Sequence, residues 1–135
     1  MSAARLFALG AVLALSACSG GTGSSSVCAQ PMIAVSPDPV ASGAMLQVDG
    51  QAWVTGCDDN SVREREVPVD GIRIELITAG SSKLLGIASA SGDAGTMGQF
   101  TVSLPVPDDT GGSATVRASG DGLTAEADVT VRATR

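Results

Sequence analysis

The chain of 135 residues contains no histidine and no tyrosine, and its aromatic side chains are one tryptophan and two phenylalanines. The missing histidine removes the side chain that most often acts as a general base and most often binds transition metals. Sugar-binding grooves are normally lined with aromatic rings, of which this chain has few. The composition argues against an enzyme, and we expect no cofactor.

Positive charge is also scarce, with 8 basic against 14 acidic side chains and a net charge of −6. Nucleic-acid binding requires a positive surface, so DNA and RNA are excluded as partners. The 17 glycines and the 44% hydrophobic content favour a folded chain rich in turns over a disordered one. The length allows one ordinary domain with a short appendage.

The first eighteen residues, MSAARLFALGAVLALSAC, carry a single charge at Arg5, followed by an apolar run over residues 6–15. A basic start, a short apolar stretch and small residues are typical of a secretory signal peptide. The competing interpretation is a transmembrane helix. Ten helical residues rise about 15 Å against a hydrocarbon core of roughly 30 Å, so this run is too short to span.

The end of this segment, Leu15-Ser16-Ala17-Cys18, resembles the lipobox of bacterial lipoproteins. The resemblance implies that residues 1–17 are cleaved as a signal peptide and that Cys18 becomes an acylated first residue. The alternative is an ordinary signal peptide with an incidental cysteine. Loss of Arg5 leaves a charge of −7, which anionic lipid repels, so the acyl chains alone must anchor the protein. We expect an exported domain at the bacterial cell membrane or envelope.

Residues 18–27 contain the lipidated cysteine and a run of glycine, serine and threonine without apolar side chains. Such a run predicts a flexible tether with a span of about 15 Å, and a loop within a domain is the alternative. The folded domain is then expected over residues 28–135.

Cys28 and Cys57 remain as an even pair in an oxidising compartment, and we expect them to form a disulfide. In the chain-entropy model, closing the loop between Cys28 and Cys57 stabilises the folded state by roughly 3.5 kcal/mol. Two thiols without histidine are too few for a zinc site. A redox-active pair is normally closer together in the sequence.

From residue 32 onward, apolar and polar side chains alternate in short runs between glycine, proline and aspartate. This period of two predicts antiparallel strands with one buried face, and no helix is indicated. About seven strands favour an all-β sandwich. The expected strands cover residues 32–35, 46–49, 72–76, 85–87, 99–104, 114–118 and 123–132. In the fourth, Leu85 and Ile87 are expected to face the same way.

Several stretches resemble bacterial immunoglobulin-like domains: Ile33-Ala34-Val35-Ser36-Pro37, Leu46-Gln47-Val48-Asp49-Gly50-Gln51-Ala52-Trp53, Gly98-Gln99-Phe100 and Pro105-Val106-Pro107-Asp108. The resemblance covers residues 31–131 and implies an immunoglobulin-like antiparallel β-sandwich. Its motifs are turns and core positions, so they specify fold better than function. Ala41-Ser42-Gly43 departs from it, since Pro-Gly is commoner there. Trp53 is expected to be buried. The disulfide expected between Cys28 and Cys57 would join the N-terminal strand to the loop that follows Trp53.

Few residues suggest chemistry. Lys83 beside Ser81 and Ser82 has the composition of a Ser-Lys dyad, but a hairpin turn is the expected structure there. Asp58, Asp59 and Asn60 offer oxygen ligands for calcium, which Asp93 or Asp121 would complete. The same residue types favour tight turns, and we expect no metal.

The run Arg63-Glu64-Arg65-Glu66 lies in a long connection, where it forms either a solvated loop or a partner-binding loop. We expect a lipoprotein that displays a non-catalytic binding or structural module to an envelope protein or glycan. The alternatives are a small secreted enzyme, an enzyme inhibitor and a calcium-dependent adhesion module.

Overall fold

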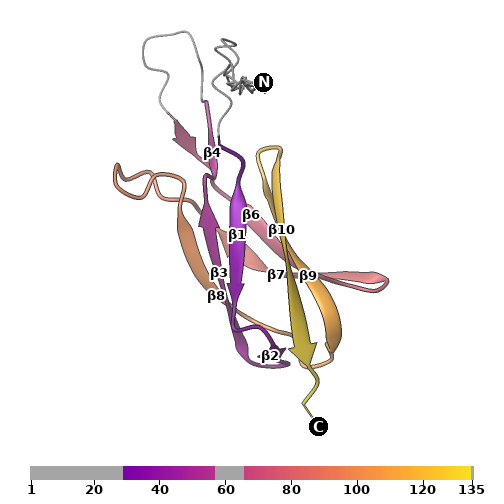
Figure 1. Cartoon of the computed structure of the whole chain (residues 1–135). Helices are drawn as coiled ribbons and strands as arrows, with labels where there is room; N and C mark the ends of the chain where they lie inside the picture. Colours follow the sequence, from indigo (N-terminus) through magenta and orange to yellow (C-terminus); the bar gives the residue numbers. More distant parts are fainter. Residues whose placement is uncertain (1–28, 57–65, 135) are drawn as a thin grey trace, which may run out of the picture.

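The computed structural model describes residues 29–56 and 66–134. These residues form ten β-strands and contain no helix (Figure 1). The strands are β1 (Met32–Ser36), β2 (Val40–Ala41), β3 (Met45–Gln51), β4 (Val54–Thr55), β5 (Val67–Pro68), β6 (Ile72–Thr78), β7 (Ser81–Ala88), β8 (Phe100–Pro105), β9 (Gly112–Gly120) and β10 (Leu123–Arg132).

The strands form two main sheets and one short ladder. The larger sheet has the order β2-β10-β9-β6-β7, and the smaller one has the order β1-β3-β8. Strands β4 and β5 pair separately as a two-stranded ladder. All pairs are antiparallel except β2 with β10, which is parallel. The expectation of a purely antiparallel fold is therefore wrong at this one edge.

Each of the seven expected segments forms a strand, so the prediction of an all-β fold is confirmed for residues 29–56 and 66–134. The expected number of strands is too low, because β2, β4 and β5 are also present. Each of these three has only two residues, which is too short for side-chain alternation to reveal it. Their pairing depends on strands that are distant in the sequence.

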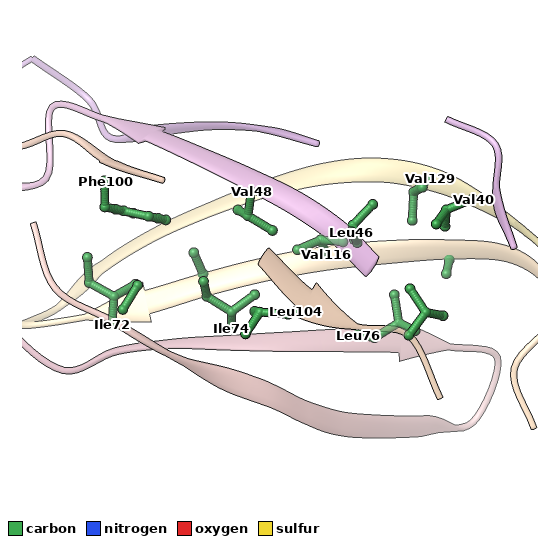
Figure 2. Packing of buried hydrophobic residues seen from close by; sticks show 14 of the residues in the cluster. Val40, Leu46, Val48, Ile72, Ile74, Leu76, Phe100, Leu104, Val116 and Val129 are labelled. Atoms are coloured by element: carbon green, nitrogen blue, oxygen red, sulfur yellow. The ribbon is translucent and has the colours of Figure 1, made fainter. Parts of the chain in front are cut away.

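The two main sheets face one another across a common apolar core, as in a β-sandwich (Figure 2). In β3 and β6, alternate residues point into this core, and the intervening ones point away from it. The buried apolar side chains include Val40, Leu46, Val48, Trp53, Val69, Ile72, Ile74, Leu76, Phe100, Leu104, Val106, Val116, Val129 and Val131.

The end of β3 brings Trp53 into this core. Gly50 faces Phe100 on β8, and a Cβ atom at Gly50 would overlap the Phe100 ring. After the strand, Ala52 has a φ of 61°, which interrupts the alternation that began at Leu46. Trp53 is consequently fully buried, as the sequence predicts.

The β1–β2 connection links the two sheets at one end of the fold. Beyond it, the main-chain N–H of Ser42 donates to the carbonyl oxygen of Arg132 over 2.8 Å, and the Ser42 and Thr134 hydroxyls lie 2.9 Å apart. The C-terminal segment is thus fastened at the end of the fold where β1 stops. The start of β1 lies at the opposite end of the fold, the end that also carries the β9–β10 turn (Figure 1).

Candidate functional site

Most side chains singled out in the sequence lie outside the described residues. This applies to Cys18, Cys28 and Cys57, to the calcium candidates Asp58, Asp59 and Asn60, and to Arg63, Glu64 and Arg65. Glu66 is described and is exposed just before β5. The lipid anchor and the disulfide therefore stay predictions, and the calcium and partner-loop alternatives stay open.

The described residues hold no cluster of three or more His, Cys, Asp or Glu side chains that could bind a metal ion. Asp93 lies in the connection between β7 and β8, and Asp121 lies in the β9–β10 turn with a φ of 48°. No helix in the described ranges is long and apolar enough to cross a membrane.

Lys83 lies on β7, just after a tight hairpin turn. Strands β6 and β7 are joined by Ala79 and Gly80, with Thr78 opposite Ser81, so the expected hairpin is confirmed. The Lys83 ammonium lies 3.2 Å from a carboxylate oxygen of Asp109, in the segment after β8. Both side chains are more than half exposed, so the pair adds little stability.

This ion pair forms part of a groove of about 650 Å³ beside the β6–β7 turn. Hydroxyl side chains dominate its polar lining, and the Thr78 and Ser81 hydroxyls are 2.7 Å apart. The residues that line the groove with a hydroxyl or a charge are Thr78, Ser81, Ser82, Lys83, Asp109, Thr110 and Ser113.

A second groove of about 500 Å³ adjoins the first and shares Thr78, Ala79 and Ser113 with it. Two carboxylates of the second groove already accept hydrogen bonds from the protein. Asp128 accepts one from the Thr115 hydroxyl over 3.2 Å. Asp38 accepts one from the main-chain N–H of Thr130 over 2.9 Å.

Together the two grooves form a polar surface at one end of the larger sheet, which we call the distal surface. Its hydroxyls both donate and accept hydrogen bonds, and its carboxylates accept them. This chemistry can bind a polar ligand. It offers no histidine as a general base, because the chain contains none.

The smaller sheet carries a separate polar group on its solvent face. Asp49 accepts hydrogen bonds from the Thr101 hydroxyl over 2.7 Å and from the Gln47 amide over 3.0 Å. These bonds, that from Thr101 first, favour the charged carboxylate and lower the pKa of Asp49 below its ordinary value of 3.8.

The distal surface was not identified from the sequence. The sequence predicts a hairpin at Lys83 and gives no sign that this residue lies beside Asp109. Outward positions on β9 and β10 carry a threonine or serine repeatedly, which is the one available signal. That signal is not specific, because such residues are also common on any solvated sheet face.

The comparisons with known proteins add no relative. The chain matches no protein-family model, no curated protein and no solved structure.

Proposed function

We propose that this chain is a bacterial lipoprotein that displays one immunoglobulin-like domain as a non-catalytic binding module at the cell envelope. Three parts make up the proposal: the immunoglobulin-like class, the lipid anchor at Cys18, and binding as the task of the domain.

The strand order supports the immunoglobulin-like class. In such domains strands A, B and E share one sheet and strands G, F and C share the other, with C′ added next to C in the variable type. The order β1-β3-β8 corresponds to the first set, and β10-β9-β6-β7 corresponds to the second. The described residues contain no equivalent of strand D, and the β4–β5 ladder lies between the equivalents of B and C.

The lipobox-like Leu15-Ser16-Ala17-Cys18 motif supports the anchor, and the route of the chain supports the orientation. A chain tethered ahead of Met32 enters the domain at the start of β1. The distal surface includes Asp128 and Thr130, which lie toward the far end of β10. At about 3.4 Å per residue, Thr130 is roughly 24 Å along this strand from Leu123.

The proposal of a binding role is based on the position of the distal surface. This surface lies at the end of the fold opposite the start of β1, so anchoring through Cys18 directs it away from the membrane. Grooves with many hydroxyls and no histidine suit reversible binding of a polar ligand better than catalysis.

Membrane fractionation of the full chain tests the anchor. Cys18→Ser is expected to move the protein out of the membrane fraction or to block its processing, because no other element would hold it. The matched control is the Cys28→Ser/Cys57→Ser double variant, which should stay in the membrane fraction. An unchanged distribution of Cys18→Ser would refute the lipoprotein assignment.

Chemical labelling tests the orientation, because Lys83 is the only lysine of the chain. In an acylated mature protein, the Lys83 amine would be the single reactive amine. A membrane-impermeant amine reagent should label Lys83 in cells whose plasma membrane is intact. Labelling only after that membrane is broken would place the domain on the cytoplasmic side and contradict the proposal.

A further inference from the structure

Strand β7 is the last strand of the larger sheet, and the described residues include no strand that pairs with its outer side (Figure 1). Leu104 of β8 lies where a Cβ atom of Gly86 would be, so Leu104 packs on the core face of β7. In the described residues, the outer edge of β7 is unpaired along Ser81–Ala88. Open edges present main-chain donors and acceptors that an extended peptide can use.

Two apolar side chains stand at this edge. Leu84 is 45% exposed and Ile87 is 58% exposed. Because Ile87 lies an odd number of positions after Leu84, a regular strand would place their side chains on opposite faces. The register shift between Ile74 and Glu75 leaves Leu85 unpaired, with Leu84 opposite Glu75 and Ile87 opposite Arg73.

Leu84 and Ile87 consequently share the solvent face of the sheet, whereas Leu85 packs against the core. The expectation that Leu85 and Ile87 face the same way is wrong for this reason. The nearest charges on that face, Arg73 and Glu75, lie 3.6 Å apart and offset each other. The site next to Leu84 and Ile87 therefore suits apolar side chains.

A second copy of this chain is a poor occupant for the edge. The net charge of −6 causes repulsion between two whole molecules. A foreign strand without net negative charge avoids this repulsion, and a hydroxyl side chain opposite Lys83 adds no like charge.

We propose that the open edge of β7 binds an extended segment of a partner polypeptide by strand addition. Apolar side chains of the segment contact Leu84 and Ile87, and its hydroxyl side chains lie toward Lys83 and the larger groove. The main-chain hydrogen bonds supply affinity, and the alternation of side chains supplies selectivity. This inference rests on the proposed role as a binding module and names the class of partner.

Two synthetic peptides test the inference. The probe is Ac-Lys-Thr-Val-Thr-Val-Thr-Lys-NH₂, and its control has the same side chains with N-methyl groups on both valines. The control keeps the apolar contacts but loses main-chain donors. Isotope-labelled full chain in detergent micelles is titrated with each peptide, and amide chemical shifts are recorded.

The probe is expected to shift the amides of residues 81–88 and to bind at least about tenfold more tightly than the N-methylated control, since strand addition depends on main-chain N–H groups. Equal binding of both peptides would overturn the proposal. Absence of shifts in β7 at millimolar peptide would do the same. Concentration-dependent shifts of β7 without peptide would instead assign the edge to a second copy.

Side-chain variants provide the second measurement. The Leu84→Ser/Ile87→Ser double variant is expected to weaken probe binding by about tenfold, because each change removes apolar contact area. Met45→Ser is the matched control, since Met45 is 54% exposed on the other sheet. Similar weakening by both would contradict docking at β7. Such a result would not change the outcome expected from membrane fractionation of the Cys18 variant. The proposals of strand addition at β7 and of a lipid anchor can therefore be refuted independently.

Discussion

The indole N–H of Trp53 donates a hydrogen bond to the main-chain carbonyl oxygen of Met32 over 3.2 Å. The Trp53 ring is fully buried, and its centre lies 5.9 Å from the centre of the Phe100 ring at an angle of 60°. One side chain thus joins the start of β1, the segment after β3 and the first residue of β8. This relationship holds together the end of the fold where the chain enters.

Trp53→Ala is expected to lower the free energy of unfolding by about 3–5 kcal/mol, because it removes a large buried ring and leaves a cavity. That loss is a large part of the stability of a small domain. Trp53→Phe should cost less, since it keeps an aromatic ring and loses the bond to Met32. Urea unfolding followed by circular dichroism measures both, and a Trp53→Ala variant as stable as the parent would contradict the burial.

Gly50→Ala is expected to destabilise the domain by about 1–3 kcal/mol, because a Cβ atom at this position overlaps the Phe100 ring. Gly95→Ala is the matched control, since a Cβ atom there meets no atom within 4 Å. Thermal unfolding should show a clear shift for the first variant and little for the second. A double-mutant cycle with Phe100→Leu should reveal coupling between the two positions, and simple additivity would argue against the overlap.

Thr101→Val is expected to raise the pKa of Asp49 toward its ordinary value, because it removes the first of the two hydrogen bonds that favour the carboxylate. A lowered folded-state pKa contributes stability above the unfolded-state value of 3.8, and this contribution is lost as the pH falls through the folded-state pKa. The variant should therefore be less stable than the parent at pH 7, and the difference should shrink toward pH 2.

Carboxyl chemical shifts recorded across an acid titration measure the Asp49 pKa directly. Thr115→Val, on the other sheet, is the control and should leave the Asp49 pKa unchanged. A Thr101→Val variant with the parental Asp49 pKa would show that the Thr101 hydroxyl does not favour the charged form.

Cys28 and Cys57 are expected to form a disulfide in exported protein, so neither thiol should react with an alkylating agent before denaturation and reduction. Reduction should lower the free energy of unfolding by at most roughly 3.5 kcal/mol. Mass spectrometry of freshly exported full chain is the measurement. Two alkylated cysteines without prior reduction would refute the pairing.

Side-chain alternation located the seven longer strands, because a strand with one buried face must place apolar residues at every second position. The burial of Trp53 also followed from the sequence, since aromatic side chains are so scarce in this chain. The lipobox-like motif, the tether and the cysteine pair are linear features as well, and they remain predictions because they lie outside the described residues.

Only the tertiary structure determines which strands pair and which side chains are exposed at the edges of the sheets. The parallel pairing of β2 with β10 joins residues about ninety positions apart, a relation that no local pattern encodes. The register shift beside β7 puts Leu84 and Ile87 on one face, and the distal surface gathers residues from four separate segments. Alternation is a local property of each strand, whereas register and edge exposure depend on long-range backbone pairing, which is why only the folded chain reveals them.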